Sequence, residues 1–513
     1  MSVTIFADLL SDPSKFINDL KGVIKGVIVT NVTHGLPPQR GFSPDSRIPN
    51  ERSGLNTTYA WNDKGKSSLF YEYPFPIWGL TNEESVGVIN KAKDNQKGNY
   101  NTWPRWSATL NVFMQATHDS KTCLRRSQCQ PVGGQSVWSS VEEIKEDKDT
   151  ILVIASMDTI SFFQDYALGA DSDISGTVAL MGAYQYLRLT RASDLQKYSK
   201  NVIFAWFDGE TFGYVGSSRF ARDISSFSCE KTAKSGGCES PAGYSNLDFK
   251  NIDFSKIESI IELKQVGLTK NGGSSLFIHQ HEDASKTSLL VEAALQAGAD
   301  TENLELKLST STKGLPPSSS MSFIKQDKKM AAKTIVITDH NTEYNNAHYH
   351  GIFDRTVDSQ LVCEASTMLT KLIWDQVGMP PNSNVKANCT IVSELLECML
   401  VNGSCSTMRG IFKEGFSSVP THYSSVYSEN RRNTWNFFLY EWLFRLGAIN
   451  HKDMSCDKKH SCPALMECSE SGHCIGSLVR WHKAMSTGLY EKATGYYTIV
   501  DDSKEIWTEA TWS

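Results

Sequence analysis

The 513-residue sequence lacks several features that would assign it to a common class of protein. It has no excess of positive charge: 51 Lys and Arg stand against 57 Asp and Glu, and the net charge of -6 offers no basic surface for nucleic acid. It has no internal repeat, no low-complexity segment and no apolar run long enough to span a bilayer. Nucleic-acid partners are therefore set aside. The 40% hydrophobic fraction at this length suggests two or three globular domains, or one large domain with appendages.

No signal peptide opens the sequence either, yet its cysteines and sequons point to the secretory route. Cysteines at short spacing staple loops in secreted chains and more often bind metal in cytosolic ones. The candidates for disulfides are Cys123, Cys129, Cys229, Cys238, Cys389, Cys398, Cys405, Cys456, Cys462, Cys468 and Cys474. N-glycosylation sequons stand at Asn31, Asn56, Asn388 and Asn402. Together these features predict an oxidising, glycosylating compartment, and a sequence of this kind without a signal peptide or a membrane span resembles a trimmed ectodomain.

The last four of these cysteines are evenly spaced, with five residues between neighbours. This spacing lacks the paired C-x2-C knuckles that are typical of structural zinc sites, so disulfides are favoured. The connectivity of the four stays open, and so does the partner of Cys363.

Sequence patterning divides the chain into a smaller lobe and a larger one. Residues 1–148 are rich in turn signals and aromatics, with short strands such as residues 21–30, and we expect them to form the smaller lobe. Within it, residues 41–71 carry Pro, Gly, Ser and Asn, which indicates a long surface loop, either a functional lid or a floppy insertion. Residues 149–512 are expected to form the larger lobe, whose helical, cysteine-rich extension begins at about residue 388.

Strands and helices alternate in the larger lobe. Apolar segments predict strands at 150–156, 201–207, 257–263, 274–279 and 333–338, and helices are predicted at 175–189, 286–297, 359–376 and 433–446. Strands that are apolar throughout and separated by helices indicate a sheet covered on both faces. The predicted fold class is α/β, with a mixed, mostly parallel sheet covered by helices on both faces.

One glutamate, Glu210, stands just after the strand predicted at 201–207. In open α/β sheets ligands bind outside the carboxyl ends of the strands, so Glu210 lies where a catalytic acid would lie, but no second acid stands beside it. The alternative is a carboxylate that caps the following helix, and both readings stay open. Tyr214 could line the same pocket or be a buried structural tyrosine.

Four motifs follow one another on this α/β core: SMD at 156–158, GADSDISG at 169–176, GETFG at 209–213 and HYHGIFD at 348–354. Their order, and the strand or helix before each, resembles the fold of the di-zinc aminopeptidases. That resemblance puts Glu210 at the general-base position and Asp158 at a position that supports a ligand. It puts the metal-ligand positions of the family on Ser156, Ser172, Thr211, Lys264 and His350.

These residue types do not suit a two-metal site. A zinc hydrolase needs several protein ligands per metal, and a shared carboxylate offsets the repulsion between the two cations. The hydroxyls of Ser172 and Thr211 are poor ligands, and the Lys264 ammonium would repel a cation unless Gln265 faces the pocket instead. We therefore expect no metal, no other cofactor and no catalytic residue.

The run GETFGYVGSSR, preceded by NVIFAWFD, is very similar to the signature of the nicastrin family, the large glycosylated ectodomain subunits of the γ-secretase intramembrane protease. Further similar runs are MDTISFF, CLRRS, VWSS, ITDH and the closing WTEATW, so that the resemblance extends over roughly residues 70–512. The family signature usually has an acid before the tyrosine, and this sequence has Gly213 there.

The resemblance implies a non-catalytic pseudo-aminopeptidase: the lumenal or extracellular ectodomain of a single-pass type I membrane protein of the endoplasmic reticulum, Golgi, endosome and plasma membrane, whose transmembrane helix is absent from this chain. The implied partners are a presenilin-type protease with its companion membrane subunits, and the implied substrates are type I membrane proteins with short ectodomains. The degenerate pocket would either bind a free amino terminus or exclude long ectodomains sterically. Its candidate substrate contacts are Glu210, Tyr214, Gly213, Thr211, Ser172 and His350. Two alternatives stay open: an active zinc aminopeptidase with altered ligands, and a purely structural assembly subunit.

Overall fold

The computed structural model covers the chain except for several short segments. The described residues are 2–5, 25–30, 32, 40–51, 58–71, 73–97, 105–109, 119–193, 198–234, 236–240, 244, 246–269, 273–281, 288–428, 432–457, 462, 466–468, 472–486, 488–491, 496–499 and 506–510. The sequons at Asn31 and Asn56 lie outside the described residues.

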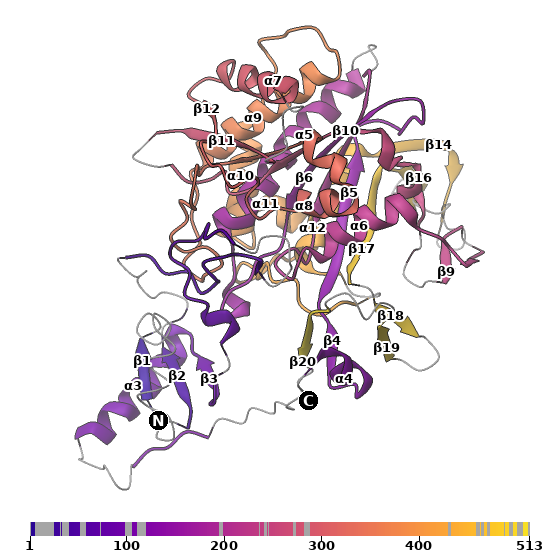
Figure 1. The fold of residues 1–513 in the computed structure, drawn as a ribbon. Helices are drawn as coiled ribbons and strands as arrows, with labels where there is room; N and C mark the ends of the chain where they lie inside the picture. Colours follow the sequence, from indigo (N-terminus) through magenta and orange to yellow (C-terminus); the bar gives the residue numbers. More distant parts are fainter. Residues whose placement is uncertain are drawn as a thin grey trace.

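An eight-stranded mixed sheet forms the centre of the larger lobe (Figure 1). Its strand order is β12, β11, β13, β10, β6, β7, β5, β17. The strands are β5 (Gly133–Ser140), β6 (Thr150–Ser156), β7 (Asn201–Phe207), β10 (Ile257–Leu263), β11 (Ser275–Gln280), β12 (Glu305–Leu308), β13 (Thr334–Thr338) and β17 (Val479–Met485). The central strands β13, β10, β6 and β7 run parallel, whereas the pairs β11 with β13, β5 with β7 and β17 with β5 are antiparallel. The predicted mixed, mostly parallel sheet is confirmed.

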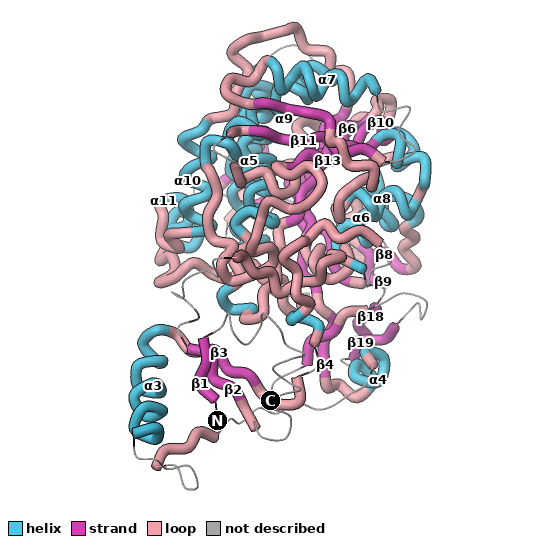
Figure 2. The backbone as a smooth tube through the Cα atoms, turned by 60° about the vertical axis from the view of Figure 1, so that its left-hand side comes forward, coloured by secondary structure: helices cyan, strands magenta, loops and turns pink. Residues whose placement is uncertain are grey.

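Helices cover both faces of this sheet, as Figure 2 shows. One face carries α5 (Ser175–Ser193), α7 (Ser288–Ala299), α9 (Ser359–Gln376), α10 (Cys389–Leu400), α11 (Ser406–Phe412) and α12 (Thr434–Gly447), and the other carries α6 (Val215–Ser226) and α8 (Ser320–Gln326). Alternate side chains of β6 explain the two layers: Ile151 and Val153 belong to the first core, and Leu152 and Ile154 pack with Phe220 of α6 in the second. A strand that is apolar at every position needs this double cover.

The edge of the sheet beyond β7 is built from strands that are distant in sequence. β5 falls within residues 1–148, yet it pairs with β7 and, on its other side, with the C-terminal strand β17. A lobe boundary at residue 148 therefore separates β5 from the sheet to which it belongs. Local sequence pattern does not reveal such a pairing, because the partner strands come from far along the chain.

The N-terminal region contributes a small parallel sheet of β1 (Ser2–Ile5), β2 (Val27–Thr30) and β3 (Ile77–Gly79), followed by α3 (Asn82–Lys97). It lies at one end of the molecule, away from the large sheet (Figure 1). Val27, Val29 and Phe75 share an apolar cluster with Ile352, and Phe162 and Phe163 pack against that cluster. The small sheet is thus joined to the larger lobe by a common core.

Short elements complete the chain: α4 (Ser120–Arg125), β4 (Cys129–Pro131), β8 (Lys231–Thr232), β9 (Cys238–Ser240), β14 (Ile449–Ser455), β15 (Met466–Cys468), β16 (His473–Gly476), β18 (Gly488–Glu491), β19 (Tyr496–Ile499) and β20 (Thr508–Ala510). Disulfides join Cys123 to Cys129, Cys229 to Cys238, Cys363 to Cys389, Cys398 to Cys405, Cys456 to Cys468 and Cys462 to Cys474. Among the described residues, no helix is both long enough and apolar enough to cross a membrane.

Candidate functional site

The sequence motifs converge at one edge of the large sheet. Ser156 ends β6, Glu210 follows β7 and Lys264 follows β10, and β6 is hydrogen-bonded to both β7 and β10. The carboxyl ends of these parallel strands therefore lie side by side, as the position rule for α/β sheets requires.

Asp173 is the centre of this edge. Its side chain is fully buried, Ser156 Oγ donates a hydrogen bond of 2.6 Å to its Oδ1, and Lys264 Nζ lies 3.6 Å from the same oxygen. The other oxygen lies 3.7 Å from Nε2 of His350. We call Ser156, Asp173, Lys264 and His350 the cradle.

A π-helical turn explains why Asp173, and not Ser172, takes the central place. Gly169 adopts a left-handed conformation with φ of 60°, and residues Ala170–Ile174 then form a wide turn before α5 begins. Ser172 consequently faces away from the cradle: its Oγ lies 3.4 Å from Oγ1 of Thr159, and its N–H donates to Asp354. Reading the motif by sequence position therefore missed Asp173, and the acid one residue beyond Ser172 was the available signal.

His350 joins two carboxylates. Its Nδ1 lies 2.8 Å from Oδ2 of Asp45, and its Nε2 faces Asp173 on the opposite side of the ring. The ring stacks on Tyr349, with centroids 3.8 Å apart. Burial disfavours the charged ring, but the hydrogen bonds and charges of Asp173 and Asp45 outweigh it and raise the pKa of His350 to about 9. His350 is therefore an imidazolium at neutral pH.

The same contacts keep Asp173 ionised. Burial alone would raise its pKa, but the charges of Lys264 and His350 and the hydrogen bonds from His350 and Ser156 lower that pKa to about 2. The cradle thus holds a permanent negative charge between two positive ones.

Glu210 is buried, and its carboxylate is occupied by the helix that follows it. It accepts hydrogen bonds of 2.8 Å from the backbone N–H of Ser217 and 2.7 Å from Ser217 Oγ, in the first turn of α6. Burial raises the pKa of Glu210 to about 8, against the hydrogen bonds from Ser319 and Ser217 that lower it. The geometry is that of a carboxylate that caps the following helix, one of the two alternatives that the sequence leaves open.

The side chain of Asp158 stabilises the turn between β7 and α6. Asp158 accepts hydrogen bonds from the N–H of Glu210 at 2.7 Å, from the N–H of Thr211 at 3.2 Å and from Thr211 Oγ1 at 2.6 Å. Gly213 and Tyr214 then both adopt left-handed conformations, with φ of 74° and 60°. Glycine suits this turn at position 213, because a side chain there would be strained.

The segment 41–71 is called the lid loop, and its described residues, 41–51 and 58–71, lie over this edge. Asn50 Nδ2 donates to the hydroxyl of Tyr214 at 2.8 Å, and Ser43 Oγ donates to the carbonyl of Tyr349 at 2.6 Å. Trp61 is buried, and its carbonyl accepts a hydrogen bond of 2.8 Å from the N–H of Tyr344. The described part of the lid loop thus packs on the larger lobe, and its function as a lid stays a prediction.

A small cavity lies beside the described part of the lid loop. A cavity of about 20 Å³ is lined by Asp45, Asn50, Thr211 and Trp507, among other residues. That volume suits a single water molecule and no peptide.

The donor set of the cradle does not fit a pair of zinc ions. Lys264 directs its ammonium at Asp173, and both nitrogens of His350 are directed at carboxylates. Of the neighbouring histidines, His340 Nδ1 lies 3.4 Å from Asp339 Oδ1, and His348 Nδ1 lies 3.4 Å from the Phe42 carbonyl. In the described part of the chain, the side chains that could share one ion are Cys456, Cys462 and Cys474, which are all in disulfides. No metal-dependent step follows from these residues.

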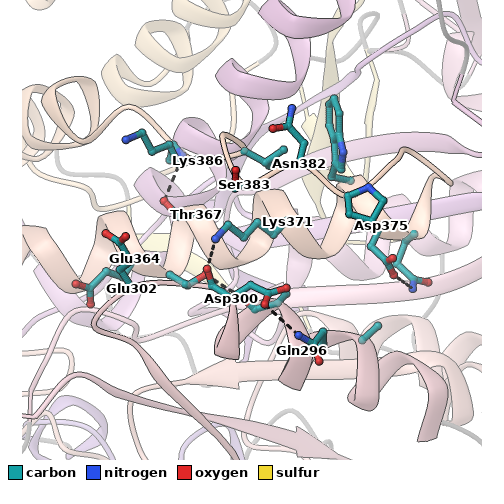
Figure 3. A pocket seen from close by; sticks show the side chains of 18 of the residues that line it. Gln296, Asp300, Glu302, Glu364, Thr367, Lys371, Asp375, Asn382, Ser383 and Lys386 are labelled. Atoms are coloured by element: carbon teal, nitrogen blue, oxygen red, sulfur yellow. Dashed lines mark hydrogen bonds between the residues drawn. The ribbon is translucent and has the colours of Figure 1, made fainter.

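A larger hollow of about 1170 Å³ lies elsewhere, between α7, α9 and the segment that leads to α10 (Figure 3). Carboxylates such as Asp300, Glu364 and Asp375 line it together with Lys371 and Lys386. None of the candidate substrate contacts is among its lining residues.

The sequons at Asn388 and Asn402 can be located. Asn388 is exposed and precedes α10, where its Oδ1 accepts a hydrogen bond of 3.1 Å from the N–H of Thr390. Asn402 is half-buried in the loop before α11. The amide nitrogen of Asn388 can therefore carry a glycan while the amide oxygen caps the helix.

Comparison with protein families gives two matches. The family model described as the nicastrin large lobe matches residues 149–376, and the one described as the nicastrin small lobe matches residues 2–116. Nicastrin of Dictyostelium purpureum is 34% identical over 517 residues, which cover 96% of this chain and 76% of that protein. Human nicastrin is 25% identical over 481 residues, which cover 80% of this chain and 63% of that protein.

Solved structures give a similar result. A crystal structure of the γ-secretase component nicastrin superimposes with a TM-score of 0.84 at 32% identity, covering 98% of this chain and 87% of that one. A zinc aminopeptidase from Bacillus subtilis gives a TM-score of 0.33 at 16% identity over 49% of this chain and 52% of its own, which is too low to carry weight.

Proposed function

The chain belongs to the nicastrin family, and from this premise we propose that it is the ectodomain of a non-catalytic subunit of a γ-secretase-type intramembrane protease complex. Its partners in this proposal are a presenilin-type protease and the companion membrane subunits. Its task is to restrict access to that protease to type I membrane proteins with short ectodomains.

The observation that carries the proposal is the closed cradle. Where a metallopeptidase would need ligands and an open coordination position, this chain has Lys264 and His350 paired with Asp173, under an ordered lid loop. A site whose central carboxylate is already paired with side-chain cations supports exclusion better than catalysis.

Steric exclusion is also better supported than capture of a free amino terminus. Capture would require the Glu210 carboxylate to face an incoming ammonium, but that carboxylate is buried and accepts two hydrogen bonds from Ser217. In the proposal Glu210 stabilises the turn, and the bulk of the ectodomain limits the length of the substrate.

A purely structural assembly role is the second candidate, because the cap that Glu210 forms is a contribution to folding alone. The two roles differ in what the assembled complex can discriminate. Steric gatekeeping requires different cleavage of long and short substrates, and an assembly role does not.

The test compares two substrates that share one transmembrane segment and differ only in ectodomain length. They are incubated with the complex assembled around this chain, and cleavage is measured alongside co-purification of the membrane subunits. We expect cleavage of the short substrate and little cleavage of the long one. Equal cleavage of both by a fully assembled complex would leave only the assembly role.

Glu210→Gln separates the two recruitment mechanisms. Glutamine keeps an oxygen that can accept the Ser217 N–H but cannot form an ion pair with an ammonium. Exclusion predicts normal assembly and normal cleavage of the short substrate. Loss of short-substrate binding with assembly intact would instead establish amine capture.

A further inference from the structure

Four buried charged side chains form a continuous row from the large sheet to the lid loop. Lys264 Nζ lies 3.6 Å from Asp173, Asp173 lies 3.7 Å from His350 Nε2, and His350 Nδ1 lies 2.8 Å from Asp45. The exposed fractions of these side chains are 5% for Lys264, 0% for Asp173, 4% for His350 and 7% for Asp45. The charges alternate in sign along the row and balance.

A row of buried charges is stable only if each charge has a partner of opposite sign. A carboxylate buried without a partner is strongly destabilised, so Asp173 needs positive charge beside it. In a metallopeptidase the metal ions meet that need at the corresponding edge of the sheet. Here the residues that meet it are part of the chain.

We propose that Lys264 and His350 are built-in cations that take the electrostatic place of metal ions at Asp173, and that His350 uses its second nitrogen to hold the lid loop closed through Asp45. The geometry at His350 supports this assignment. Nδ1 lies within hydrogen-bonding distance of Asp45, whereas Nε2 lies 3.7 Å from Asp173, beyond a hydrogen bond but within reach of an ion pair, so a positively charged ring is attracted to both carboxylates.

The link through Asp45 differs from the other ion pairs of the lid loop. Arg47 and Lys64 both pair with Asp63, within the loop and at exposed positions. The pair of Asp45 and His350 instead crosses to the larger lobe and is buried. Removing one partner of a buried ion pair costs far more free energy than removing one partner of an exposed pair, because the remaining charge is buried without compensation.

We call the ion pair of Asp45 and His350 the latch. It goes beyond the proposed function, and only its effect on substrate selection rests on that function. Loss of either partner, Asp45 or His350, leaves the charges of the row unbalanced. Without the Asp45 carboxylate, the row keeps two cations against one anion. Without the His350 cation, the row keeps one cation against two anions. Either change weakens the closed position of the lid loop, and removal of both partners adds little, because the same contact has already been lost.

Hydrogen exchange of the 513-residue chain tests the latch. We expect Asp45→Asn to accelerate exchange in peptides from residues 41–51 and 59–70 roughly tenfold or more, given the free energies of buried ion pairs. His350→Gln should do the same, and the double variant should exchange no faster than the faster single one. Peptides from β6 and β7 should stay unchanged and report that the fold is intact.

Asp63→Asn is the matched control, because it removes an exposed carboxylate from the same loop. It should leave exchange unchanged. Unchanged exchange in Asp45→Asn, additive effects in the double variant, or an equal effect of Asp63→Asn would each overturn the latch. If His350→Gln fails to fold, Asp45→Asn against Asp63→Asn still decides. Because the experiment needs no partner subunit, loss of substrate discrimination in the complex would reject the proposed function and leave this result standing.

Discussion

The Glu210 cap gives the sharpest single prediction. Glu210→Ala removes the acceptor for the Ser217 N–H and for Ser217 Oγ, at 2.8 and 2.7 Å. Ser217 Oγ keeps a partner in the hydroxyl of Ser322, 2.8 Å away, so the N–H is the group left unsatisfied. An unsatisfied buried donor and a lost helix cap together cost about 2 kcal/mol. We expect the free energy of unfolding to fall by that amount.

The assay is urea unfolding followed by circular dichroism, with hydrogen exchange of α6 as the local readout. Glu210→Gln should lose much less stability, because its amide oxygen still accepts the Ser217 N–H. Glu143→Ala, at a side chain that is 75% exposed, is the control for the removal of a carboxylate. The reasoning is refuted if Glu210→Ala unfolds at the same urea concentration as the parent chain and α6 exchanges at the same rate.

The raised pKa of Glu210 predicts how the stability difference between the parent chain and Glu210→Gln changes with pH. Burial raises the pKa of Glu210 from 4.5 to about 8, so between these values the folded chain holds a proton that the unfolded chain has released. The contribution of the protonated Glu210 carboxyl to the free energy of unfolding is therefore fully present below pH 4.5 and is lost as the pH rises through 8. Relative to Glu210→Gln, the parent chain should lose at most about 1.4 kcal/mol per pH unit over this range. A difference that is constant with pH, or that grows in the opposite direction, contradicts the assignment.

Three further predictions concern the rest of the larger lobe. Gly176→Ala should lower the melting temperature sharply, because a Cβ there would lie 2.3 Å from the backbone oxygen of Leu263, and an unchanged melting curve would argue against this close approach of α5 to β10. Replacing Cys363 and Cys389 by serine opens a disulfide that spans 26 residues and should lower stability by about 3 kcal/mol in non-reducing urea, whereas an unchanged unfolding midpoint would show that this bond does not stabilise the chain. Asn388→Gln should remove the mass of one glycan from the chain made in a secretory host, and an unchanged mass would show that this exposed sequon is not used.

Much of the fold could be predicted where a segment determines its own structure. The strands at 150–156, 201–207 and 257–263 have the bounds predicted for them, because each is a mostly apolar run that a doubly covered sheet requires. The helix at 359–376 is also confirmed, and Asp358 caps it through hydrogen bonds to Gln360 and Leu361. Local pattern could not place β5 and β17 together, since their pairing depends on chain segments more than 300 residues apart.

The candidate site, like the fold, could be predicted only where local sequence determines the structure. The position of Glu210 after β7 was predictable, but its hydrogen bonds to Ser217 depend on the left-handed turn at Gly213 and Tyr214. Asp173 was missed because a π-helical turn rotates it into the cradle in place of Ser172. Asp45 was missed because it lies 305 residues from His350 and belongs to a loop whose docking no local signal reveals.

The zinc content of the purified chain is the most direct measure of whether side chains have replaced the metal ions of the cradle. After equilibration with zinc and removal of the free ion, we predict far less than one chelatable ion per chain and no hydrolysis of aminoacyl dyes, because Lys264 and His350 already balance Asp173. Near-stoichiometric zinc, together with dye hydrolysis that a chelator abolishes, would contradict the account.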